Sequence, residues 1–249
     1  MTKILPPLIP FAVITLMLEG MVRGGFVPAY LVPAPSSVFR ALVDNRNELA
    51  TAMAKTSAAA FLGFALSTLA GIGIAVLLSS SRAIQRSFYP YAVFFQTVPI
   101  IAIAPLLVIW FGYGMQTVTA SAFIVSIFPI IANTLTGLLS TDPALRDLFQ
   151  LYGASPGVTL VKLRFPAALP QILTGLRVAS GLAVIGAVVG EFIGGEGLGS
   201  VVDVARTQQR VDKVFAAVLL ASVLGLALFG LINLISAMTL RHWHASEAS

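Results

Sequence analysis

The sequence predicts an all-α membrane protein with six transmembrane helices in one domain, residues 1–249, and three observations predict this fold class. Hydrophobic residues make up 57% of the chain and charged residues only 10%, whereas a soluble domain carries about 25% charged residues. The apolar runs are continuous rather than alternating, which favours helices over the strands of a barrel. The runs also provide the roughly 20 residues that a helix needs to cross a bilayer.

Charged residues divide the chain into the predicted spans. One uncharged run lies between Lys55 and Arg82, and a second run, residues 87–141, is long enough to cross twice with a turn at 112–114. The predicted spans are residues 4–21, 56–79, 88–111, 116–139, 172–193 and 214–240. A cleaved signal peptide is the alternative for the first span, but no small-x-small cleavage site follows it, so we expect a retained helix.

Composition also excludes several kinds of site. The chain has no cysteine, which excludes disulfides and thiolate metal sites. The net charge of +5 is spread over several loops and forms no nucleic-acid patch. Basic residues divide evenly between the two sides of the membrane, so the charges do not decide the orientation. Only the short turns differ, since residues 82–86 hold two arginines and residues 112–116 hold none.

Residues 141–171 form a long polar loop between two closely spaced spans, and its first part predicts a short helix. Asp142 is a favourable N-cap and Pro143 suits the first helical turn. We expect the helix to extend to Tyr152 and to end at Gly153, which suits a left-handed C-cap. Its apolar stripe consists of Leu145, Leu148, Phe149 and Tyr152. This stripe either packs on lipid headgroups or its own bundle, or docks in the groove of a partner.

The second part of the loop repeats these signals. Ser155 and Pro156 predict another helix start. We expect this helix to end before Pro166, because the residue before a proline is pushed out of the helical region. Pro170 then marks the entry to the fifth span.

The loop resembles a known motif. Asp147-Leu148-Phe149, three residues, Gly153, nine residues and Leu163-Arg164-Phe165-Pro166 resemble the EAA loop of binding-protein-dependent ABC transporter permeases. The family pattern is Glu-Ala-Ala, three residues, Gly, nine residues and Ile-x-Leu-Pro. The glycine, the spacing and the proline match, whereas Asp147 replaces the glutamate and Leu148 and Phe149 replace the two alanines.

The resemblance covers nearly the whole chain. Further segments are similar to the nitrate/sulfonate/taurine branch of these permeases, which also includes transporters for thiamine-precursor pyrimidines. These segments are residues 31–36, 96–99, 105–112 and 190–199.

The resemblance implies a type I ABC importer permease fold in the bacterial inner membrane, with both termini and the loop 141–171 in the cytoplasm. It implies a homodimer with a second copy of this chain, a dimer of ABC ATPase subunits, a periplasmic or lipid-anchored substrate-binding protein and contact with membrane lipid. ATP and Mg would be used by the ATPase, so we expect no cofactor or metal on this chain, no nucleic acid, and no enzyme activity of its own. In agreement, the sequence has no phosphate-binding G-x-x-x-x-G-K-[ST] loop. We interpret residues 195–199 as a flexible surface turn.

The same resemblance assigns ATPase coupling to residues of the loop. The expected coupling residues are Leu145, Asp147, Leu148, Phe149, Tyr152, Gly153, Ala154, Ser155, Leu163, Phe165 and Pro166. We expect the first short helix to lie in a cleft of the ATPase, so that its motion tilts the bundle.

Polar residues inside the spans are candidates for the substrate path. They are Gln96, Thr97, Asn133, Thr134 and Ser180, together with Glu191 at the outer end of the fifth span. Such residues alternatively bond to their own helix or hold neighbouring helices together. Glu191 either gates the path, contacts the binding protein or is an ordinary interfacial carboxylate. Pro99 and Pro105 are expected to break the third helix.

Two other functions fit the sequence less well than import. An intramembrane enzyme needs paired catalytic groups, but both histidines lie beyond the last span and no H-E-x-x-H is present. A secondary transporter or channel needs buried acids and usually repeats, but the only span acids are Glu19 and Glu191, each near an end. We therefore expect the importer permease of a small organic solute or anion. Sulfonates, nitrate-like anions and pyrimidine precursors are not distinguished by the sequence.

Two peripheral segments have simpler interpretations. Residues 26–55 are expected to form an extended strap leading into an amphipathic surface helix with Phe39, Leu42 and Val43 on one face. The tail at residues 241–244, with its tryptophan, suits a membrane-interface anchor.

Overall fold

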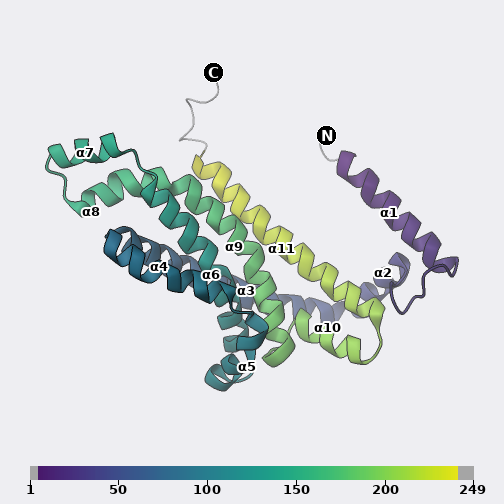
Figure 1. Ribbon diagram of the computed structural model, residues 1–249. Coiled ribbons are helices and arrows are strands. Elements are labelled where there is room, and N and C mark those ends of the chain that lie inside the picture. The colour runs from purple at the N-terminus through teal and green to yellow at the C-terminus, as the bar shows by residue number, and fades with distance from the viewer. Residues whose placement is uncertain (1–4, 241–249) are drawn as a thin grey trace.

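The computed structural model describes residues 5–240, and within this range every regular element is a helix (Figure 1). The all-α prediction is therefore confirmed, and the expected interface anchor at 241–244 lies outside the described residues. The elements are α1 (Leu5–Arg23), α2 (Pro35–Asp44), α3 (Arg46–Ser79), α4 (Arg82–Thr97), α5 (Ile100–Phe111), α6 (Met115–Leu139), α7 (Pro143–Leu151), α8 (Pro156–Thr159), the π-helix η1 (Leu160–Arg164), α9 (Phe165–Gly194), α10 (Leu198–Thr207) and α11 (Val211–Leu240).

Among the described residues, four helical segments are long and apolar enough to cross a membrane: α3, α6, Pro156–Gly194 and α11. In the centre of the bundle, α6 packs against both α3 and α9, and α11 packs on α9. Glycines allow this close approach, since a Cβ atom at Gly63 or Gly186 would lie 2.6 Å or 2.8 Å from atoms of Ala122 on α6. Small residues at helix crossings are typical of membrane bundles.

The six predicted spans are not all reproduced. The predicted third span, 88–111, is divided into α4 and α5, with extended backbone at Pro99. The expected break at Pro99 is present, whereas the expected break at Pro105 is wrong, because Pro105 lies inside α5. Loss of one backbone donor at Pro105 leaves that helix continuous.

The N-terminal helix α1 stands apart from the bundle and contacts α2 (Figure 1). Its end is fixed by Glu19, whose carboxylate accepts hydrogen bonds from the Ser36 amide at 2.9 Å and the Ser36 hydroxyl at 2.7 Å. In α2, the amphipathic helix expected after the strap, Leu42 packs towards the core, but Phe39 and Val43 are exposed. The expected amphipathic helix is therefore present, and the bundle covers only part of its apolar face.

The helix that enters the fifth span does not end before Pro166, contrary to the prediction. Helix α9 begins at Phe165, which has helical backbone angles, and contains both Pro166 and Pro170. The preceding π-helix gives the reason, because the Phe165 amide bonds to the carbonyl of Leu160, five residues back. This wider turn has room for a proline ring that a regular α-turn lacks.

Candidate functional site: the two ends of the bundle

The short helix α7 begins and ends as its sequence predicts. The Asp142 carboxylate accepts a hydrogen bond from the Ala144 amide at 2.8 Å, and Pro143 occupies the first turn. After Leu151 the chain reverses through Gly153, whose φ of +70° is in the left-handed region. The beginning and end of α7 are thus specified by its own residues.

The outer surface of α7 is free in the described chain. None of its residues is buried, and Leu145, Leu148 and Tyr152 are 45%, 44% and 84% exposed. Phe149 is half-buried, and Asp147 is exposed. The apolar stripe therefore does not pack on its own bundle, and it lies at one extreme end of the molecule (Figure 1).

Behind α7, a continuous helical segment leads into the membrane. The Ser155 hydroxyl accepts a hydrogen bond from the Val158 amide at 3.4 Å, which starts α8, and Ala154 beside it is half-buried. From Pro156 the helix continues through η1 and α9 to Gly194. Leu163, Phe165 and Pro166 are half-buried along the way. The short helix α8 is therefore continuous with the membrane-spanning helix α9.

The Arg164 side chain fastens this segment to two other helices. Its Nε donates to the Leu138 carbonyl at 3.1 Å and its Nη2 donates to the Ser79 carbonyl at 3.2 Å. These carbonyls lie at the ends of α6 and α3, where helices lack internal donors and where a positive charge is favoured. Sequence reasoning did not assign a role to Arg164, and the only signal was its charge inside the matched motif.

Replacing Arg164 by alanine is expected to lower the free energy of unfolding by about 2 kcal/mol, because two carbonyls lose a charged donor. Lys162→Ala is the matched control, since Lys162 is exposed in the same segment. Thermal unfolding of the purified variants measures the difference. Equal stabilities of the two variants would show that the Arg164 contacts do not hold the segment.

Two of the expected path residues, Gln96 and Thr97, line an open groove. They are exposed at the end of α4 and share a cavity of about 360 Å³ with apolar side chains of α6 and α9, including Phe128 and Leu182. The Thr97 hydroxyl donates to the Phe94 carbonyl at 2.7 Å. The Gln96 amide and Thr97 thus provide polar groups on one edge of an otherwise apolar surface.

Of three other expected path residues, two bond to their own helix and the third is buried. The Asn133 amide donates to the Pro129 carbonyl at 2.8 Å, and the Ser180 hydroxyl donates to the Arg177 carbonyl at 2.7 Å. Thr134 is fully buried, and its hydroxyl has no hydrogen-bond partner among the described residues. Bonds of a side chain to its own helix are the structural alternative for such residues, so the geometry adds no support for a path role here.

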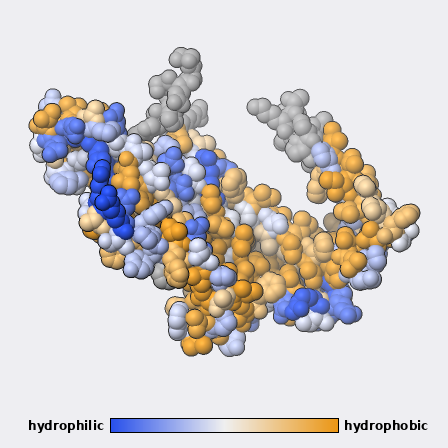
Figure 2. Space-filling view, in the orientation of Figure 1, coloured by the Kyte–Doolittle hydropathy of each residue, from blue (hydrophilic) through white to orange (hydrophobic). Residues whose placement is uncertain are grey.

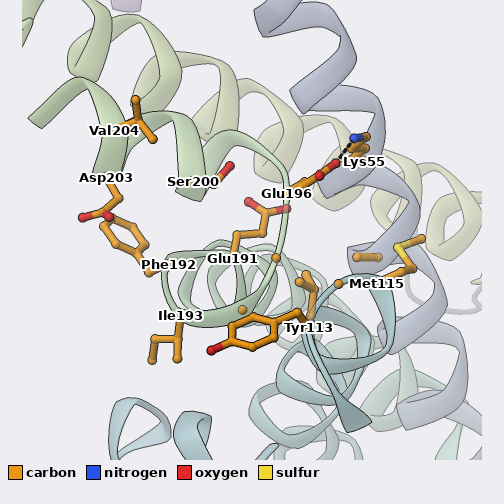
Figure 3. A pocket seen from close by; sticks show the side chains of 15 residues that line it. Lys55, Tyr113, Met115, Glu191, Phe192, Ile193, Glu196, Ser200, Asp203 and Val204 are labelled. Carbon is orange, nitrogen blue, oxygen red and sulfur yellow. Dashed lines mark hydrogen bonds and ion pairs between the residues drawn. The ribbon is translucent and has the colours of Figure 1, made fainter. Parts of the chain in front are cut away.

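At the opposite end of the bundle, Glu191 organises the start of α10. Glu191 is only 2% exposed, and its Oε2 atom accepts a hydrogen bond from the Gly199 amide at 2.7 Å. The neighbouring Leu198 amide donates to the Thr56 hydroxyl of α3 at 2.9 Å. Figure 3 shows Glu191 pointing from α9 towards the turn that precedes α10. Glu191 and Thr56 therefore satisfy free amides at the α10 N-terminus.

The interpretation of residues 195–199 as a flexible surface turn is wrong, and α10 was not expected. Gly197, Leu198 and Gly199 are buried. A Cβ atom at Gly197 would overlap the Glu191 carboxylate, and one at Gly199 would overlap the Val188 carbonyl oxygen. These glycines provide room for close contact with α9 rather than freedom of motion.

A cavity of about 590 Å³ opens beside this turn (Figure 3). Charged side chains in its lining include Lys55, Glu191, Glu196 and Asp203. Lys55 pairs with Glu196, and the hydrogen bond from its ammonium, followed by its charge, lowers the pKa of the Glu196 carboxyl below the usual value. No group of three His, Cys, Asp or Glu side chains in the described part of the chain is placed to hold a metal ion.

Comparisons with known proteins agree with this arrangement. The family described as "Binding-protein-dependent transport system inner membrane component" matches residues 67–239. A "Probable ABC transporter permease protein" of Haemophilus influenzae is 38% identical over 91% of this chain and 93% of its own length. A "Formylaminopyrimidine transport permease protein" of Halalkalibacterium halodurans is 39% identical over 82% of each chain. In fold, the chain is similar to a solved structure of the MetNI methionine ABC transporter in an inward-facing conformation, with a TM-score of 0.71 at 18% identity, covering 78% of this chain and 97% of that chain.

Proposed function

Since the chain belongs to the binding-protein-dependent transport system inner membrane components and is the permease subunit of an ABC importer, we propose that α7 is its docking site for the ATPase. The exposed apolar stripe of α7 carries this proposal, because it has no partner among the described residues and continues into a membrane-spanning helix. A helix with one apolar face commonly binds in a groove of a partner. Loop 141–171 thereby lies on the cytoplasmic side.

In this mechanism, closure of the ATPase dimer moves α7, and Gly153 keeps α7 at a fixed angle to α8. The Arg164 bonds to Leu138 and Ser79 carry the displacement to α6 and α3 as well as α9. At the other end, α10 moves with α9 because Glu191 binds its N-terminus. The path beside Gln96 and Thr97 then opens alternately to the two sides.

The absence of native cysteine allows a direct test of docking. A single cysteine introduced by Leu148→Cys is expected to cross-link to the ATPase in the assembled transporter. A cysteine introduced by Glu196→Cys, at the opposite end of the bundle, is the control and is expected not to react with the ATPase. Cross-linking from position 196 instead of 148 would overturn the proposed docking site.

For the cargo, we propose a small organic solute, with a formylaminopyrimidine as the first compound to test. The support is the 39% identity to the permease named for that compound, compared with 30% to a putative aliphatic sulfonate permease of Bacillus subtilis. Thermal-shift measurements on the partner substrate-binding protein should show stabilisation by formylaminopyrimidine and not by an alkyl sulfonate. Stabilisation by the sulfonate alone would reverse the assignment.

A further inference from the structure

A polar groove of about 690 Å³ lies at the α7 end of the bundle, between the end of α3, the start of α4 and α7 itself. Its lining includes Ser80, Ser81, Arg82, Arg86 and Arg146. Figure 2 shows strongly hydrophilic side chains gathered at the end of the molecule that α7 and α8 form. The groove is separate from the exposed apolar stripe of α7.

The three arginines of this groove have no charge partner. Arg82 and Arg86 lie one turn apart on α4, Arg146 lies on α7, and none of them forms an ion pair or side-chain hydrogen bond within residues 5–240. Arg164 donates to the carbonyl of Ser79, a lining residue of the groove, and its charge repels that of Arg146. The groove therefore holds a concentration of positive charge that no acidic side chain balances.

The other end of the bundle is different. There four basic residues are paired with acids, Lys55 with Glu196, Lys213 with Glu48, Arg206 with Asp203 and Arg210 with Asp212, whereas Arg40 and Arg46 form no ion pair within the described chain. The groove differs in bringing three unpaired arginines into one lining that contains no acidic side chain. An anion from outside the chain would balance these charges.

The position of the groove indicates which anion. Ser79 and Leu139, the last residues of the membrane-spanning helices α3 and α6, both line it, so it lies where these helices leave the bilayer. Tyr89, an aromatic residue typical of the membrane interface, lies on its wall. A guanidinium binds two phosphate oxygens at once. Basic grooves between membrane helices commonly bind lipid headgroups.

We propose that this groove binds the phosphate of an anionic phospholipid headgroup, held by Arg82 and Arg86 of α4 and by Arg146 of α7. The inference rests on the proposed function only in placing this end at the cytoplasmic leaflet. A headgroup bound in this way connects the ATPase-docking helix to α4, so anionic lipid stabilises the position of α7 relative to the membrane.

Native mass spectrometry of the purified permease tests the proposal, with phosphatidylglycerol and phosphatidylcholine titrated separately. The unmodified protein is expected to retain phosphatidylglycerol in preference to phosphatidylcholine. The double variant Arg82→Gln/Arg86→Gln is expected to bind phosphatidylglycerol about 30-fold more weakly, since each basic residue near anionic lipid contributes roughly a fivefold factor. Arg40→Gln, which removes an exposed arginine of α2, is the control and is expected to bind like the unmodified protein.

Each other outcome contradicts the proposal. Equal phosphatidylglycerol binding by the double variant and the control, with both eluting as folded protein, would overturn the site. Displacement of bound lipid by millimolar inorganic phosphate would show a site for free phosphate rather than lipid. Lipid retention is measured without the ATPase, so the two tests are independent. Lipid binding can fail while cross-linking from position 148 succeeds, and lipid binding can succeed while cross-linking fails.

Discussion

Gly153→Asp is expected to leave the permease folded and inserted but to uncouple ATP hydrolysis from uptake. The residue has a φ of +70°, a conformation that costs an L-residue with a side chain about 1–2 kcal/mol. No atom lies within 4 Å of the added Cβ, so the effect arises from the backbone and not from a clash. The chain relieves the strain by changing the angle between α7 and α8, and α7 then no longer moves α9 correctly. Uptake in proteoliposomes is expected to fall about 5- to 30-fold while ATP hydrolysis continues.

Gly157→Asp is the matched control for this variant. Gly157 lies nearby in α8, also has open space around it, and has no positive φ. It therefore receives the same charge without the backbone strain, and coupled uptake is expected to persist. Normal coupling in Gly153→Asp would show that the turn does not transmit the motion of the ATPase.

The Gly199→Ala variant is expected to be destabilised and largely inactive. Its Cβ would overlap the Val188 carbonyl oxygen and lie 2.9 Å from the Cβ of Glu191. The start of α10 has to move away from α9, which breaks the 2.7 Å hydrogen bond from the Gly199 amide to Glu191. Overpacking together with an unsatisfied buried carboxylate is expected to cost about 3 kcal/mol. Thermal unfolding and uptake, measured on the same preparation, report both effects.

Gly225→Ala controls for the loss of a glycine in a membrane helix, because no atom lies within 4 Å of a Cβ at that position in α11. This variant is expected to be as stable as the unmodified protein or slightly more stable, owing to the higher helix propensity of alanine. If Gly199→Ala behaves like Gly225→Ala, close contact between α10 and α9 is not required for the fold.

The parts of the loop that could be predicted are those whose structure depends on neighbouring residues. Asp142 and Pro143 determine the start of α7, and Gly153 permits the turn after it, without any distant contact. The same local rules gave a wrong boundary at Pro166, because a π-turn made the proline acceptable within a helix. A register change of this kind depends on the packing of Phe165 beside Leu138 and Ala168, which no local pattern contains.

The unpredicted parts of the candidate site depend on contacts between distant segments. The partners of Arg164 are 26 and 85 residues away in the sequence. Thr56 accepts a hydrogen bond from an amide that is 142 residues away. The sequence alone predicts a flexible turn before α10, because glycine permits many conformations. In the structure, glycine is required there because α10 approaches Glu191 so closely that a side chain would not fit.

The uninterrupted helix from Pro156 to Gly194 has a mechanical consequence. Its 39 residues form a helix about 59 Å long at the usual rise per residue. This length is roughly twice the thickness of the hydrocarbon layer. Such a helix either extends into the aqueous phase or is strongly tilted from the membrane normal. A rotation of only about 10° then displaces one tip relative to the other by about 10 Å. If α7 docks on the ATPase as proposed, a small displacement there is expected to open and close a passage for a small molecule.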